Sequence, residues 1–211
     1  LRECLRACQH LADVDLHMYS EPSLPQLPSS LTSLTLSKPT ALRAVPLSPS
    51  IRRLSLKGCQ EELLDAPAQL LGFTQLTSLS LASCGLAEVP DWVAALPALE
   101  VLEMPDNKLD DLPELDCIDS LRRLVLYGGA LEWVPGALEA ASRLSYLNLA
   151  GHDFLEICEG SLGVLCSLPA LRLLAVSCCE GIEPEDLGGE EDGEEEAYYG
   201  YVGWSRLRGS L

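Results

Sequence analysis

A frame of three apolar residues, L-x-x-L-x-L, occurs eight times along this chain and constrains its fold more than any other feature. Positions one, four and six of every frame are apolar, in a sequence that is 47% apolar. The frames begin at Leu11, Leu31, Ile51, Leu76, Leu99, Leu121, Leu144 and Leu171. They are thus 20, 20, 25, 23, 22, 23 and 27 residues apart. A supersecondary unit that recurs at this period is typical of a solenoid, in which each repeat packs only against its neighbours.

Each frame predicts a short β-strand with two different faces. Because side chains alternate along a strand, positions four and six face the core, and positions three, five and seven face the other side. Prolines favour extended return segments in the first two repeats. Helices are predicted at 61–73, at 92–96 with Asp91 as N-cap, at 136–141 and at 160–168. The predicted fold class is α/β: a horseshoe-shaped solenoid with a parallel concave sheet and mixed helical and extended convex segments.

The chain divides into four segments by composition. Residues 1–10 have helical apolar spacing and are expected to cap the first repeat, since an exposed end of the leucine column must be covered. Residues 11–182 hold the eight repeats. Residues 183–196 contain nine acidic residues and no base, which predicts disorder. Residues 197–211 are rich in aromatic residues and are expected to form a C-terminal cap or a truncated repeat, with a linear binding motif as the alternative.

Charge and cysteine content restrict the partners and the compartment. The net charge is −18, so binding to nucleic acid or to anionic lipid through charge is not expected. Most of the nine cysteines are scattered through the repeats, no N-x-S/T sequon occurs, and no apolar run is long enough for a membrane span. No signal sequence is visible. These features predict a monomer in a reducing compartment, the cytoplasm, with the nucleus as the alternative.

The sequence contains no arrangement of residues that indicates catalysis. His10, His17 and His152 fall in different repeats, and none is paired in sequence with a nucleophile. Cys178 and Cys179 are adjacent, which is not a metal-ligand spacing. No glycine-rich phosphate loop occurs. We therefore expect no enzyme activity, no metal and no cofactor.

Three of the repeats resemble the leucine-rich repeat family, whose common form is L-x-x-L-x-L-x-x-N/C-x-L-x-x-L/V-P. The matching stretches are LTSLSLASCGLAEVP (76–90), LEVLEMPDNKLDDLP (99–113) and LRRLVLYGGALEWVP (121–135). The stretches LSLKGC and LAVSCCEGI, in the third and eighth repeats, resemble the cysteine-containing subtype found beside F-box domains. Position nine departs from the expected Asn or Cys in four repeats, where it is Tyr19, Pro39, Gly129 and His152. Those turns must satisfy their backbone in another way.

The resemblance implies that a protein or peptide binds on the concave face, through the side chains at positions three, five and seven. Arginine and tyrosine concentrate binding energy at interfaces, and both occur in the middle of this face. The predicted partner-binding residues are Arg53, Lys57, Ser78, Ser80, Glu103, Arg123, Tyr127, Tyr146 and Asn148. The predicted role is a non-catalytic scaffold, adaptor or signalling module.

Two other roles remain open. The cysteine-containing repeats suggest the substrate-recognition part of an F-box ubiquitin-ligase receptor, which requires an F-box upstream of Leu1. The acidic run suggests a histone-binding or enzyme-inhibiting protein, because a repeat body with an acidic tail resembles the acidic nuclear phosphoprotein family.

Overall fold

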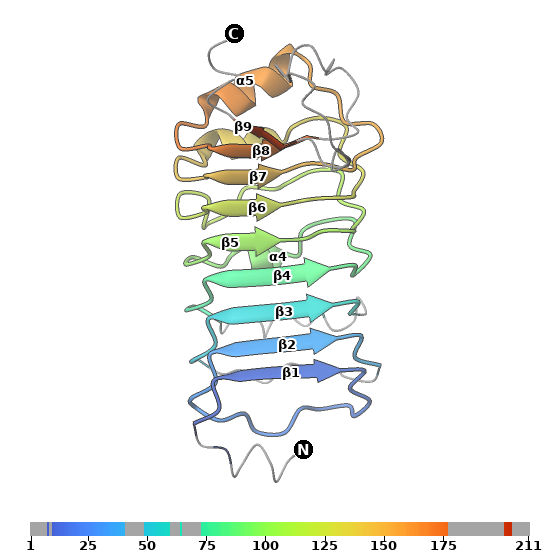
Figure 1. The fold of residues 1–211 in the computed structure, drawn as a ribbon, viewed down its shortest axis with the longest axis vertical. Coiled ribbons are helices and arrows are strands. Elements are labelled where there is room, and N and C mark those ends of the chain that lie inside the picture. The colour runs from blue at the N-terminus through green and yellow to red at the C-terminus, as the bar shows by residue number, and fades with distance from the viewer. Residues whose placement is uncertain are drawn as a thin grey trace, which may run out of the picture.

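The computed structural model describes residue 8, residues 10–40, 49–59, 64 and 73–176, and the backbone of 201–203. Within these residues the strands form one open sheet in sequence order (Figure 1). Eight consecutive strands are parallel, and β9 pairs antiparallel to β8. The strands are β1 (Asp13–His17), β2 (Ser33–Ser37), β3 (Arg53–Lys57), β4 (Ser78–Ala82), β5 (Val101–Glu103), β6 (Arg123–Val125), β7 (Tyr146–Asn148), β8 (Leu173–Ala175) and β9 (Tyr201–Gly203). The predicted repeat solenoid is confirmed.

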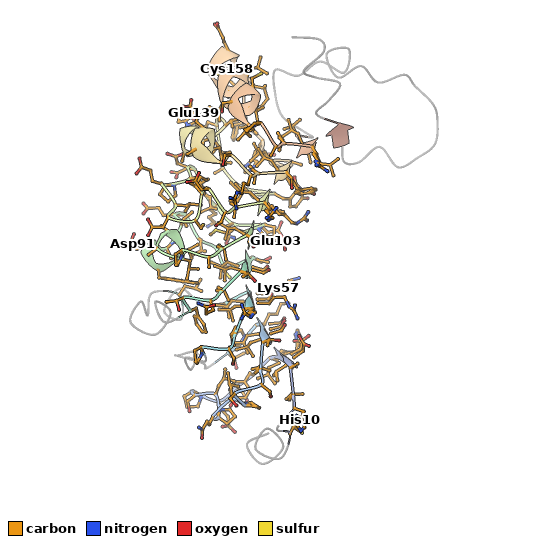
Figure 2. The ribbon with its side chains drawn as sticks, turned by 90° about the vertical axis from the view of Figure 1, so that its left-hand side faces the viewer. His10, Lys57, Asp91, Glu103, Glu139 and Cys158 are labelled. Atoms are coloured by element: carbon orange, nitrogen blue, oxygen red, sulfur yellow. The ribbon has the colours of Figure 1, made fainter. Side chains whose placement is uncertain are left out.

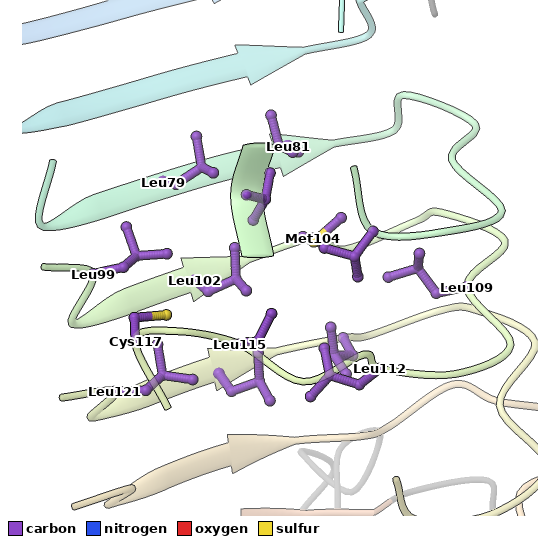
Figure 3. Close-up of a cluster of buried hydrophobic side chains, with 14 of the residues drawn as sticks. Leu79, Leu81, Leu99, Leu102, Met104, Leu109, Leu112, Leu115, Cys117 and Leu121 are labelled. Atoms are coloured by element: carbon purple, nitrogen blue, oxygen red, sulfur yellow. The ribbon is translucent and has the colours of Figure 1, made fainter. Parts of the chain in front are cut away.

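The register of the sheet places equal frame positions side by side. Leu79 pairs with Leu102, and Leu124 pairs with Leu147, so one apolar column runs through the repeats. From Leu31 to Val176, every residue at positions one, four and six is at most 5% exposed. Figure 3 shows part of this column between β4 and β6. The three frame residues of the first repeat are only half-buried, and they lie at the end of the stack.

Position eight of the frame turns the chain out of the strand in every one of the first seven repeats. The residues there all have a positive φ between 50° and 74°: Met18, Lys38, Gly58, Ser83, Asp106, Gly128 and Gly151. In the first six of these, the backbone N–H donates to the position-seven carbonyl of the next repeat at 2.7 to 2.9 Å. The left-handed turn therefore extends the hydrogen-bond ladder beyond the strand.

In two repeats the side chain at position nine closes the turn of the preceding repeat. Asn107 is 5% exposed, and its Oδ1 accepts from the N–H groups of Cys84 and Leu86 at 3.1 and 3.2 Å. Its Nδ2 donates to the carbonyl of Leu81 at 2.7 Å. His152 replaces asparagine two repeats later, and its Nδ1 accepts from the N–H of Leu131 at 3.2 Å. The imidazole thus satisfies the turn of the preceding repeat, where position nine is glycine.

The described return segments contain short helices, two of which follow a proline directly. Helix α4 (Asp91–Ala94) begins one residue earlier than predicted, because Pro90 has the non-helical N-cap conformation and its carbonyl accepts the first bond from Val93, at 2.8 Å. The predicted N-cap, Asp91, is therefore wrong. Residues 136–141 form the 3₁₀ helix η1 (Gly136–Ala140) rather than an α-helix. Helix α5 (Glu159–Ser167) lies where the helix at 160–168 was predicted.

Several sequence predictions fall on residues that the structure does not describe. Of the helix predicted at 61–73, only Leu64 and Phe73 are described. Most of the predicted N-terminal cap and the whole acidic segment 183–196 also lie outside the described residues. Of residues 197–211, only the backbone of β9 is described, and it covers the hydrogen-bonding edge of β8. The division of the chain into four segments stays a prediction.

Candidate functional site

Positions three, five and seven form one exposed surface of the sheet, which we call the open face. Figure 2 shows Lys57 and Glu103 on this side of the molecule, and Asp91 and Glu139 on the opposite side. The burial patterns of the strands, such as exposed and half-buried residues alternating with buried leucines in β3, agree with this assignment. The nine predicted binding residues lie along this surface, from β3 to β7. The strands bring some of them together and leave others apart.

Arg123 links three neighbouring strands on the open face. Its Nε donates to Oε1 of Glu103 on β5 at 2.8 Å, and its guanidinium carbon lies 3.8 Å from the ring centre of Tyr146 on β7. The side chains of Arg123 and Glu103 are 40% and 33% exposed. Burial lowers the pKa of Arg123, but the Glu103 carboxylate and Tyr146 raise it above its ordinary value. We call Glu103, Arg123 and Tyr146 the arginine cluster.

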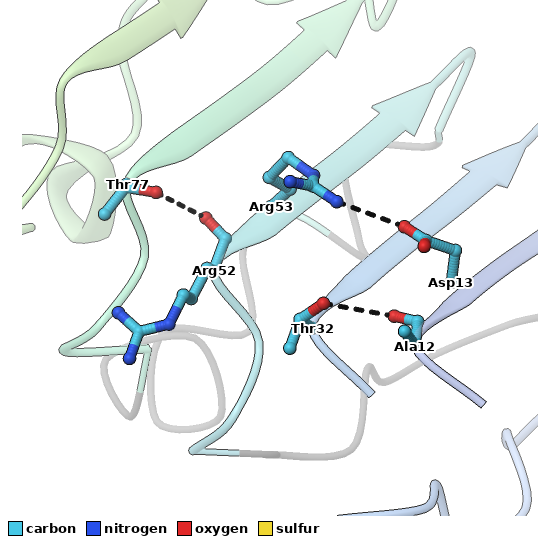
Figure 4. A network of polar contacts seen from close by, with 6 residues as sticks. All are labelled: Ala12, Asp13, Thr32, Arg52, Arg53 and Thr77. Atoms are coloured by element: carbon cyan, nitrogen blue, oxygen red, sulfur yellow. Dashed lines mark hydrogen bonds and ion pairs between the residues drawn. The ribbon is translucent and has the colours of Figure 1, made fainter. Parts of the chain in front are cut away.

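Arg53 takes part in a separate group of polar contacts at the N-terminal end of the sheet. Its Nη2 donates to Oδ1 of Asp13 at 3.2 Å, across β2 (Figure 4). Both side chains are more than 60% exposed, so this ion pair contributes little to stability. Arg53 and Arg123 share position three of the frame but are separated by Ser78 and Val101. The structure therefore divides the predicted site into two basic centres.

The other predicted residues differ in how they are oriented. Lys57 is exposed at the end of β3, and Ser78 and Ser80 are half-buried on β4. Asn148 uses its Oδ1 locally, accepting from the N–H of Ala150 at 3.0 Å. The ring of Tyr127 lies over Gly151, close enough that a Cβ there would be 3.0 Å from it. Asn148 and Tyr127 are therefore committed to the turns that follow β6 and β7.

Sequence reasoning missed a pair of exposed aromatic side chains outside the open face. Trp133 is 54% exposed and Phe154 is 69% exposed. Both follow the turn of their repeat and line the same surface depression. A signal was present in the sequence, because the seventh repeat has one residue more than the fifth and sixth repeats between position six and the next buried leucine.

The part of the chain that the structure describes offers no site for a metal. No three His, Cys, Asp or Glu side chains gather there in a way that could hold an ion. No helix in the same part is long and apolar enough to cross a membrane. What the geometry does provide is a polar sheet surface with two arginines.

The chain is similar to proteins that carry leucine-rich repeats. It is 32% identical over 127 residues to leucine-rich repeat-containing G-protein coupled receptor 5 of Rattus norvegicus, which covers 59% of this chain and 14% of that protein. It is 37% identical over 117 residues to Toll-like receptor 9 of Canis lupus familiaris, and this match covers 50% of this chain and 11% of that receptor. It is 33% identical over 126 residues to the volume-regulated anion channel subunit LRRC8E of Homo sapiens, and this match covers 58% of this chain and 15% of that subunit.

These matches extend over only a small part of each relative, so the chain spans no more than 15% of their length. No family model matches the chain. The repeat frame, the parallel stack and the shared character of the relatives nevertheless agree. The chain is a leucine-rich repeat protein.

Proposed function

We propose that this chain is a non-catalytic module that binds a protein or peptide on the open face of its sheet. Its relatives are receptors and a channel subunit by name, and all carry the same repeats. The fold supplies a rigid surface in which alternate residues are free of any role in the core. Binding by such a surface needs no catalytic group.

The arginine cluster is the observation that carries the proposal. Arginine and tyrosine are enriched among residues that dominate binding energy. Here Glu103 and Tyr146 hold the guanidinium in place, which reduces the conformational entropy lost when a partner binds. The described strands of the open face also carry three acids, Asp13, Asp15 and Glu103, against the bases Arg53, Lys57 and Arg123. This surface is thus electrically balanced in a chain of net charge −18.

Affinity capture with a matched pair of variants tests the proposal. The wild-type chain, the double variant Arg123→Ala/Tyr146→Ala and the control Arg122→Ala are used as baits, and captured proteins are quantified by mass spectrometry. Arg122 is the neighbouring arginine, is similarly exposed and pairs with Glu100 rather than with the arginine cluster. A true partner is captured by the wild-type chain and by the control but not by the double variant. When its affinity is then measured with purified protein, the double variant should bind it more weakly by several kcal/mol. Retention by a folded double variant contradicts the proposal.

The proposed compartment is the cytoplasm or the nucleus. Six cysteines among the described residues are free thiols, including the buried Cys59 and Cys117. Free thiols in this number favour a reducing environment. Thiol counting on protein prepared from its native source tests this: six or more free thiols are expected, and disulfides between the described cysteines contradict it.

The F-box and histone-binding roles stay predictions. A pulldown with basic proteins, tested for salt sensitivity, separates the histone-binding role from the leading proposal.

A further inference from the structure

Two aromatic and two acidic side chains form a second candidate site, away from the open face. Glu132, Trp133, Phe154 and Glu156 line a shallow surface depression of about 270 Å³. The N–H of Glu156 donates to the carbonyl of Glu132 at 2.8 Å, so the backbones of the two glutamates are adjacent across the sixth and seventh repeats. We call this group the acidic-aromatic site. It shares no residue with the arginine cluster.

The exposure of Phe154 follows from a local change in the repeat. Met104 and Leu109, like Leu126 and Leu131, are five residues apart, whereas Leu149 and Leu155 are six apart. All six of these side chains are buried. The extra residue must therefore leave the column.

Phe154 cannot return to the core. His152 and Leu155 on either side are both 0% exposed, so the chain is fixed before and after it. Phe154 is instead 69% exposed, and the other aromatic side chain, Trp133, is 54% exposed. Large apolar side chains that are fixed in solvent beside one another mark interaction sites more often than single exposed residues do.

The chemistry of the site selects a cation. The faces of tryptophan and phenylalanine attract a cation through the ring quadrupole. The carboxylates of Glu132 and Glu156 are both exposed at the same depression and add opposite charge. A planar guanidinium can lie on an aromatic ring and donate to a carboxylate at the same time, which an ammonium group does less well. The net charge of −18 attracts the same kind of ligand.

We propose that the acidic-aromatic site binds an arginine side chain from an extended basic segment of a protein partner. The guanidinium lies against Trp133 and Phe154 and pairs with Glu132 and Glu156. The site can operate together with the open face or without it, because the two surfaces have no residue in common.

Nuclear magnetic resonance on the whole chain tests this with a defined probe. The indole N–H signal of Trp133 is assigned with the variant Trp133→Phe, since the chain has only three tryptophans. The probe is the peptide acetyl-Gly-Arg-Gly-Arg-Gly-amide at low salt. Its control replaces both arginines with citrulline, which keeps the shape of the side chain but removes its charge. The arginine peptide is expected to shift the Trp133 signal in a saturable way, and the citrulline peptide is not.

Variants assign the interaction to named groups. Glu132→Gln/Glu156→Gln and Phe154→Ala are each expected to weaken the peptide by about fivefold or more, in line with about 1 kcal/mol for an exposed cation–π or charge contact. Glu139→Gln removes an exposed carboxylate on η1 and should leave the affinity unchanged. Arg123→Ala should also leave it unchanged, so failure of the open-face proposal and failure of this one are distinguishable.

Three outcomes overturn the inference. The Trp133 signal does not move with the arginine peptide, or it moves equally with the citrulline peptide. Alternatively, the signal depends on protein concentration without peptide and this dependence is lost in Phe154→Ser, which would mean that a second copy of the chain occupies the site.

Discussion

Gly129 and His152 are packed so closely that a side chain added at Gly129 meets the imidazole. A Cβ on Gly129 would lie 2.8 Å from Cε1 and 3.2 Å from Nδ1 of His152. The imidazole cannot move away cheaply, because it is fully buried and Nδ1 accepts from the N–H of Leu131. Gly129 is not among the glycines with a positive φ, so an alanine there is disfavoured by contact alone. Gly129→Ala is expected to cost about 2 kcal/mol, as overpacked cores do.

His152→Asn is expected to change the result. Nε2 of His152 is buried without a hydrogen-bond partner, and an unsatisfied buried group costs about 1–3 kcal/mol. Asparagine at this frame position can instead bond as Asn107 does, with Oδ1 accepting two N–H groups and Nδ2 donating to carbonyls. We expect this variant to be more stable by about 1 kcal/mol. With the imidazole removed, Gly129→Ala should cost less than about 0.5 kcal/mol, which gives a coupling of about 1.5 kcal/mol.

Urea denaturation followed by circular dichroism measures this double-mutant cycle. The wild-type chain, both single variants and the double variant are compared at pH 8, where the histidine is neutral in the folded and unfolded states. A coupling within about 0.3 kcal/mol of zero would refute the reasoning, because independent sites add within that error.

Three further predictions concern stability. In urea denaturation, Leu124→Ala should lower the free energy of unfolding by about 2–5 kcal/mol, because this side chain is fully buried. Ser80→Ala should lower it by less than about 0.5 kcal/mol, because Ser80 faces out. Equal losses would mean that the repeat frame is assigned in the wrong register. Burial lowers the pKa of His152, so below about pH 6.5 the unfolded chain binds a proton that the folded chain does not, and stability should fall as the pH falls. His152→Asn should remove that part of the slope, and an unchanged slope would contradict the assignment. Gly128→Ala should cost about 1–2 kcal/mol because its φ is +69° and its Cβ would lie 3.1 Å from Oδ1 of Asp106, whereas Gly136→Ala, with open space around it, should lower the melting temperature little or not at all.

The column of the solenoid could be predicted from the sequence because burial in a repeat array is periodic. Once Leu102 and Leu124 are placed at position four, every equivalent residue faces the same way, and the parallel register follows. The left-handed turn at position eight was not predicted. Glycines at 58, 128 and 151 fall at equal frame positions and were a sufficient signal, but Met18 and Lys38 at the same position concealed it.

The open face could be predicted as a set of residues but not as a geometry. Period-two alternation places Arg123 and Tyr146 on one side of the sheet, whereas the contact between them depends on side-chain torsions that the sequence does not specify. The acidic-aromatic site was missed for a different reason. A single added residue before Leu155 moves Phe154 out of the column, and repeat reasoning treats such an insertion as irregularity.

Photo-crosslinking tests most directly whether a partner lies on the open face. A photoreactive phenylalanine analogue is placed either at Ser80 on β4 or at Glu139 on η1. Figure 2 shows Glu139 on the opposite side of the molecule from Glu103, which lies on the open face. Both substitutions are on the surface and leave the core intact. The partner retained in affinity capture should crosslink from Ser80 and not from Glu139. Crosslinking from Glu139 alone would contradict the account.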